Sequence, residues 1–234
     1  MFELNGRESG SPDTLERNSD EVKPVIGYYG YWTVLTYLSA VSAVLGMYFA
    51  VGGNIRAALV CLMLSGLCDM FDGPAARLKK RTEREKNYGI QIDAFADIIS
   101  FGALPVVIGY AVSSGSQAQN GMLAGIAIFT AYLLASLIRL AYFCVTETEL
   151  KRKNARRVYF EGLPTTSVAL IIPFAYSVCS FFDISLLPAV YNALLAVLAV
   201  AFVLRVKIPK PRGLFLLILA LIGLSVLFSI LLFG

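Results

Sequence analysis

The chain has 234 residues, of which 57% are hydrophobic and only 15% are charged. Soluble domains carry about 25% charged residues, so this composition excludes an ordinary soluble protein and indicates an integral membrane protein. The net charge of +4 is small for the whole chain, and we expect no nucleic-acid partner.

The first 27 residues are polar and rich in Ser, Glu, Asp and Asn. They lack the apolar core of a signal peptide, so we expect a flexible cytosolic segment over 1–27 and a transmembrane domain over 28–234. The apolar runs of the second part predict an all-α fold, a polytopic membrane helix bundle of about six to eight transmembrane helices. Seven spans are predicted, at 33–51, 54–75, 90–112, 121–146, 164–182, 186–204 and 213–233.

Most of the 20 Lys and Arg residues lie in the loops after the second, fourth and sixth predicted spans. These basic segments are 77–86, 151–157 and 205–212. Because basic loops favour the cytosolic side of a membrane, the pattern predicts a multi-pass protein of the cell membrane with a cytosolic N-terminus and an outward C-terminus. An alternating path of seven spans agrees with this distribution of charge.

Four aspartates lie where the second span ends and the third begins: Asp69, Asp72, Asp93 and Asp97. The spacings i,i+3 and i,i+4 put each pair on one face of its helix, near the cytosolic end. A carboxylate in a membrane helix costs about 2.5–3.5 kcal/mol, so such acids usually have a function. Neither helix supplies a Lys or Arg to neutralise them, which makes a divalent metal site the simplest explanation.

The chain contains no histidine, the commonest metal ligand, and the two facing pairs of acids would form a site made of oxygens alone. An all-oxygen site favours hard cations, Mg²⁺ or Mn²⁺, over zinc or copper. Four carboxylates are more than one ion needs. They therefore favour two divalent cations, an arrangement that supports displacement at phosphorus.

The residues that follow the first pair of acids are small, and a basic residue comes about one turn later. Gly73, Ala75 and Ala76 would let a bulky group approach the backbone. The guanidinium of Arg77 could then hold a phosphate or a nucleotide. Gly89, at the start of the third span, also leaves room; a small residue there more often serves close helix packing, but the nearby acids favour substrate access.

The order Asp-x-x-Asp-Gly-x-x-Ala-Arg, then Gly-x-x-x-Asp-x-x-x-Asp, resembles the signature of the CDP-alcohol phosphatidyltransferases. The positions that carry it are Asp69, Asp72, Gly73, Ala76, Arg77, Gly89, Asp93 and Asp97. The resemblance implies a CDP-alcohol phosphotransferase-like fold that binds a CDP-linked lipid and two divalent ions. It also implies transfer of the phosphatidyl group to an alcohol with release of CMP, in a homodimer surrounded by membrane lipids.

The same resemblance implies roles for these residues. The metal ligands would be Asp69, Asp72, Asp93 and Asp97. The base for the attacking hydroxyl would be Asp97. The cytidine and its diphosphate would be held by Asp69, Gly73, Ala76, Arg77 and Gly89. The chain departs from the family pattern in the loop 78–88, which is longer than usual, so contacts between this loop and the nucleotide should differ.

Three segments further along are similar to the phosphatidylserine synthase branch of the family: IISFGALP at 98–105, RLAYF at 139–143 and GLPTT at 162–166. That branch usually has Ser after the third aspartate, where this chain has Ala94. The expected substrates are therefore CDP-diacylglycerol and L-serine. Glycerol 3-phosphate and inositol remain alternative acceptors. A divalent-cation transporter is the remote alternative, although the acids lie at one face of the membrane only.

Apart from Arg56, at the outer edge of the second span, Arg139 is the one basic residue predicted inside an apolar span, near its cytosolic end. Its side chain could extend to the membrane surface or pair with an aspartate of a neighbouring helix. It could instead bind the carboxylate of serine or a phosphate. Both interpretations stay open at the level of sequence.

Overall fold

The computed structural model describes residues 27–77, 82–114, 119–152, 159–205, 207–209 and 214–233. The α-helices are α1 (Tyr31–Val51), α2 (Ile55–Arg77), α3 (Glu83–Asp97), α4 (Leu104–Ser113), α5 (Gln119–Arg152), α6 (Val168–Phe182), α7 (Leu187–Val203) and α8 (Leu214–Phe233). The shorter elements are a π-helical segment η2 (Ile98–Ala103), the 3₁₀ turns η3 (Thr165–Ser167) and η4 (Ile184–Leu186), and the strands β1 (Tyr159–Glu161) and β2 (Lys207–Pro209).

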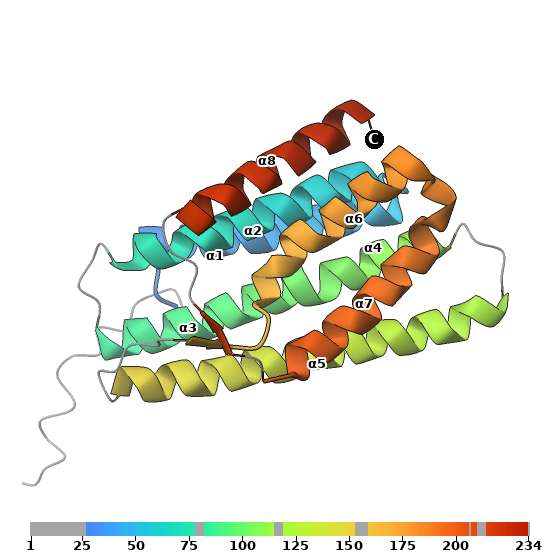
Figure 1. The fold of residues 1–234 in the computed structure, drawn as a ribbon. Helices are drawn as coiled ribbons and strands as arrows, with labels where there is room; N and C mark the ends of the chain where they lie inside the picture. The colour runs from blue at the N-terminus through green and yellow to red at the C-terminus, as the bar shows by residue number, and fades with distance from the viewer. Residues whose placement is uncertain are drawn as a thin grey trace, which may run out of the picture.

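Long helices that run up and down past one another form the described part of the molecule (Figure 1). Within it, five helical segments are long and apolar enough to cross a membrane: Thr33–Val51, Glu83–Ser113, Leu123–Leu150, Thr165–Phe182 and Ile184–Val203. Helix α8 adds a shorter apolar stretch, Leu221–Leu232. The predicted spans fall on described helices, with 90–112 on the continuous helix of α3, η2 and α4, although α2, predicted as the second span, is not among the five segments. The prediction of an all-α polytopic membrane bundle is confirmed.

The predicted loop 78–88 is wrong in its second half, because α3 begins at Glu83. Thr82 starts this helix as an N-cap: its hydroxyl accepts a hydrogen bond from the backbone N–H of Glu85, whose carboxylate accepts one from the backbone N–H of Thr82. Such a capping box starts a helix even where the sequence is highly charged. Residues 78–81 and the predicted flexible segment up to residue 26 lie outside the described residues.

Two basic segments meet through a short antiparallel ribbon. Strand β1 pairs with β2, with Phe160 opposite Ile208. Because β1 follows α5 and β2 follows α7, the loops after these helices lie at one end of the bundle. Helix α2 ends and α3 begins at this same end (Figure 1). The three basic segments therefore belong to one end of the bundle, as predicted, whereas the side of the membrane that this end faces stays a prediction.

Short polar side chains bring α1 close to both helices that carry the acids. Thr36, Ser39 and Ser42 are buried at every third position of α1. Ser42 Oγ donates to the carbonyl of Cys61 on α2 at 2.9 Å, and Ser39 Oγ lies 3.1 Å from Ser100 Oγ on η2. Small hydroxyl residues let membrane helices approach closely and add hydrogen bonds of about 0.6 kcal/mol each. Helix α1 thereby helps to fix the spacing between α2 and α3.

The helix that carries the second pair of acids changes its winding directly after Asp97, where η2 begins. In an α-helix the carbonyl of Phe101 would pair with the N–H of residue 105, but that residue is proline and has none. Tyr132 on α5 instead donates its hydroxyl to this carbonyl at 2.6 Å. Backbone groups in a membrane need such partners, so α5 stabilises the distorted winding next to the site.

Candidate metal centre and active site

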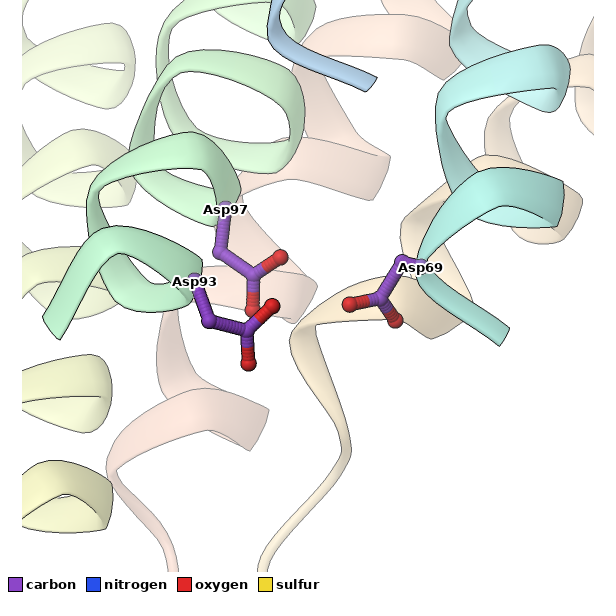
Figure 2. A group of neighbouring side chains, drawn as sticks. All are labelled: Asp69, Asp93 and Asp97. Carbon is purple, nitrogen blue, oxygen red and sulfur yellow. The ribbon is translucent and has the colours of Figure 1, made fainter. Parts of the chain in front are cut away.

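Three of the four predicted acids converge from two helices. Asp69 on α2 points toward Asp93 and Asp97 on α3 (Figure 2). One carboxylate oxygen from each residue lies within 4.8 Å of the others. Asp97 is buried, with 9% of its surface exposed, whereas the other two are half-buried. Carboxylates this close repel one another unless a cation or a proton lies between them.

The chemistry of these donors fits a hard divalent cation. All three ligand atoms are carboxylate oxygens, and oxygen donors suit Mg²⁺ and Mn²⁺ better than zinc or copper. The oxygens come from α2 and α3, and hydroxyl groups of α1 bond to both sides of the site. Ser42 donates to α2, and Ser39 lies within hydrogen-bond distance of Ser100 on η2, which continues α3. The described part of the chain therefore contains the framework of a metal site at the place that the sequence predicts.

Asp72 lies outside this group of three, one turn further along α2 than Asp69. Its Oδ2 accepts a hydrogen bond from Thr36 Oγ1 of α1 at 3.3 Å. Thr36 is a residue that sequence reasoning missed. Its only signal is its place among the small hydroxyl residues of α1, which is also the pattern of simple helix packing.

The residues expected to hold the nucleotide come directly after the acids on α2 and directly before them on α3. Helix α2 continues through Gly73 and Ala76 to Arg77, although the side chains of these residues lie outside the described part. Gly89 is half-buried on α3, about one turn before Asp93. Along α2 and α3, these positions flank the acids in the sequence.

Tyrosines that the sequence analysis did not single out lie next to Gly89. Tyr88 Oη is 3.1 Å from Tyr37 Oη on α1, and the Tyr88 ring lies 5.4 Å from that of Tyr28, measured between centroids. These rings connect the start of α1 with α3 beside the acids. The run of aromatic residues before the first span was the available signal, and it is equally typical of a membrane–water interface.

Arg139 brings two of the three downstream segments together. Its Nη2 donates to the carbonyl of Gly162, in the turn after β1, at 3.2 Å. The third segment packs on the same helix: a Cβ added at Gly102 would lie 3.2 Å from Leu133 and 3.7 Å from Ser136. The segments IISFGALP, RLAYF and GLPTT therefore converge around α5, beside the acids.

The chain matches the family model described as CDP-alcohol phosphatidyltransferase over residues 33–206. It is similar to the CDP-diacylglycerol–serine O-phosphatidyltransferase of Saccharomyces cerevisiae, with 37% identity over 120 residues, which cover 50% of this chain and 40% of that protein. It is also similar to the archaetidylserine synthase of Methanothermobacter thermautotrophicus, with 25% identity over 190 residues, which cover 81% of this chain and 73% of that protein.

A further relative is the CDP-diacylglycerol–serine O-phosphatidyltransferase of Bacillus subtilis, with 26% identity over 124 residues, which cover 53% of this chain and 64% of that protein. The match with the yeast protein thus spans less than half of that protein's length. No solved structure matches the chain.

Proposed function

Because the chain belongs to the CDP-alcohol phosphatidyltransferase family, we propose that it transfers the phosphatidyl group of CDP-diacylglycerol to the hydroxyl of L-serine. The products are phosphatidylserine and CMP. The observation that carries this proposal is the convergence of Asp69, Asp93 and Asp97 from two helices, at the spacing of the family signature. A cluster of carboxylates at one end of a membrane bundle suits a substrate that has a lipid part in the membrane and a polar diphosphate at its surface.

Serine as the acceptor is supported by two independent features. Two of the three relatives described above are named for CDP-diacylglycerol and the third for an archaetidyl lipid, but all three names contain serine. In this chain, two of the segments similar to the serine branch meet at Arg139, and the third packs on the same helix. A guanidinium can bind a carboxylate through two parallel hydrogen bonds, and serine has a carboxylate whereas inositol has no acidic group. Glycerol 3-phosphate would offer the guanidinium a phosphate instead.

Two divalent cations, Mg²⁺ or Mn²⁺, are proposed to bind to Asp69, Asp72, Asp93 and Asp97. When bound, such ions neutralise phosphate oxygens and stabilise the charge of the leaving group. The protein's own contribution is to hold the carboxylates in place before the substrate arrives. The hydrogen bond from Thr36 to Asp72 and the close packing of α1 on both acid-bearing helices serve this purpose.

The proposed reaction forms a bond between the serine oxygen and the phosphorus of the phosphatidyl group, and breaks the bond between that phosphorus and the oxygen of CMP. Asp97 is proposed to take the proton of the serine hydroxyl, as the base that the family signature implies. It is the buried member of the three acids. General-base catalysis of this kind contributes about 10²–10⁴-fold to a rate.

Asp69, Gly73, Ala76, Arg77 and Gly89 are proposed to hold the cytidine and its diphosphate. Their places on the last turns of α2 and the first turns of α3 support this assignment. Because CMP and serine are soluble in the cytosol and the basic segments gather at this end, the site is proposed to face the cytosol of a multi-pass protein of the cell membrane.

The acceptor can be identified with purified protein. CDP-diacylglycerol and Mn²⁺ or Mg²⁺ are supplied together with serine, glycerol 3-phosphate or inositol, and the released CMP is measured. We expect release to depend on serine. Release that depends on glycerol 3-phosphate or inositol, with none on serine, would contradict the proposed acceptor while leaving the reaction class intact.

A further inference from the structure

Gly162 leaves no space for a side chain, because the guanidinium of Arg139 and the backbone carbonyl of Leu204 both lie against it. A Cβ added at Gly162 would lie 2.6 Å from Arg139 Nη1 and 2.8 Å from the carbonyl oxygen of Leu204. The backbone of Gly162 has φ of +78°, and its carbonyl accepts a hydrogen bond from Arg139 Nη2 at 3.2 Å. A positive φ favours glycine in any case. At this position the guanidinium adds a second, steric requirement.

Arg139 lies at the depth of the acids. Helix α5 runs antiparallel to the continuous helix α3–η2–α4 beside it (Figure 1). Gly102 faces Ser136: a Cβ added at Gly102 would lie 3.7 Å from the Cβ of Ser136. From this contact, Asp97 lies five residues back along its helix and Arg139 three residues further along α5, which is the same direction because the two helices are antiparallel. At about 1.5 Å per residue, the two residues differ in depth by roughly 3 Å. A molecule bound at the acids is therefore at the depth of the guanidinium.

The turn that contains Gly162 is attached firmly to α5. The turn follows β1, and β1 pairs with β2, which comes after α7. Between α7 and β2, the guanidinium of Arg205 lies over the ring of Tyr142, 5.3 Å from its centroid. Tyr142 is on α5, the same helix as Arg139. The ribbon thus holds the Gly162 carbonyl at a fixed place relative to α5, where it can orient the guanidinium.

We propose that Gly162 is a positioning residue, which holds Arg139 so that its guanidinium binds the carboxylate of the acceptor amino acid. The Gly162 carbonyl orients the guanidinium by accepting from Nη2, and an oriented guanidinium can pair with a carboxylate through two parallel hydrogen bonds. This inference rests on the proposed function, because it assigns Arg139 to the acceptor rather than to the nucleotide. It predicts that residue 162 controls acceptor affinity without contacting the acceptor.

The test is a double-mutant cycle of Gly162→Ala and Arg139→Ala in the full chain, measured as KM for serine, KM for CDP-diacylglycerol and kcat. Gly53→Ala is the matched control: its φ is +79°, and a Cβ there would meet nothing within 4 Å. Gly53→Ala therefore imposes the same backbone strain without any collision. Thermal unfolding of each variant reports whether it is folded.

We expect Gly162→Ala to raise KM for serine by about 10- to 100-fold, as misplacement of a binding group does, while KM for CDP-diacylglycerol and the Gly53→Ala control change little. In the Arg139→Ala background, Gly162→Ala should change KM for serine by less than about twofold, because it acts through Arg139. Equal effects in both backgrounds, or an equal rise in both KM values, would overturn the inference.

Two further outcomes are also decisive. If Gly162→Ala gives no folded protein, the collision with the Leu204 carbonyl is a sufficient cause, and Arg139→Lys then tests the inference. Lysine keeps the charge but lacks the planar fork, so KM for serine should rise at least about tenfold while KM for CDP-diacylglycerol stays unchanged. An unchanged KM for serine in Arg139→Lys would overturn the positioning role. If the unmodified protein releases CMP without any dependence on serine, the proposed function itself fails, and the assignment of Arg139 to a carboxylate fails with it. Serine-dependent release with no coupling between the two residues overturns the positioning role alone.

Discussion

The carboxylate of Asp97 is the group on which the proposed chemistry depends most, and an amide replaces it with little change in shape. We expect Asp97→Asn to lower serine-dependent CMP release by at least about 10²-fold, because the base and a metal ligand are both lost. The bundle should stay folded in thermal unfolding, since the change also removes repulsion among three neighbouring carboxylates.

The matched control for Asp97→Asn is Asp183→Asn, an acid at the opposite end of the bundle. Asp183 is exposed between α6 and α7, where hydrogen bonds from the side chain and then the backbone N–H of Ser185 lower its pKa. Activity of this control should be unchanged. Turnover retained in Asp97→Asn would contradict the role of Asp97 as base.

The hydroxyl of Thr36 is expected to matter through Asp72. Thr36→Val keeps the shape of the side chain but removes the donor to Asp72 Oδ2, whereas Thr36→Ser keeps the donor. Partners of metal ligands typically contribute about 10- to 100-fold to metal affinity or activity. We therefore expect Thr36→Val to need about tenfold more Mn²⁺ for half-maximal CMP release, with Thr36→Ser close to the unmodified protein. Equal metal dependence of all three proteins would rule out this role.

At the residue scale, helical spacing was enough to predict that Asp93 and Asp97 share a face, and the convergence of Asp69 with them is what the structure adds. The contact between Thr36 and Asp72 joins residues 36 positions apart on different helices. No local pattern encodes such a contact. The sequence could therefore predict that acids from the two helices lie together, but not that Asp72 stays outside the group of three, nor which side chain bonds to it.

Among the helices, the distorted winding of η2 depends on a hydroxyl from α5. Tyr132→Phe removes the donor to the Phe101 carbonyl and leaves the aromatic packing in place. We expect it to destabilise the folded protein by about 1 kcal/mol, measured as a lower Tm in detergent. Tyr110→Phe on α4 is the control, because Tyr110 is exposed. An unchanged Tm in Tyr132→Phe would show that the winding does not depend on this hydrogen bond.

At the scale of elements, hydropathy predicted where the helices lie but not how two of them begin and bend. The capping box at Thr82 moved the start of α3 into a segment whose charge had indicated a loop. The π-helical winding of η2 was also unpredicted, although Pro105 was visible in the sequence. A proline predicts a missing N–H, whereas the tyrosine that replaces this donor comes from a distant helix.

For the whole molecule, the ribbon of β1 and β2 and the junction of α2 and α3 put the basic segments at one end of the bundle. We predict that this end is cytosolic. A single cysteine placed at Asn87, in a chain whose four own cysteines are replaced, should react with a membrane-impermeant thiol reagent only after the cells are opened. A cysteine at Ser114, between α4 and α5, should react in intact cells. The reverse pattern would contradict the predicted orientation. The homodimer and the domain boundary at residue 28 stay predictions.

The formation of phosphatidylserine itself tests the central claim most directly. Purified protein is incubated with CDP-diacylglycerol, Mn²⁺ or Mg²⁺ and isotopically labelled serine, and the label in the lipid fraction is measured by mass spectrometry. The proposed function predicts labelled phosphatidylserine and CMP in equal amounts, both abolished by chelation of the metal and by Asp97→Asn. CMP release without labelled lipid, or labelled lipid formed equally well by Asp97→Asn, would contradict it.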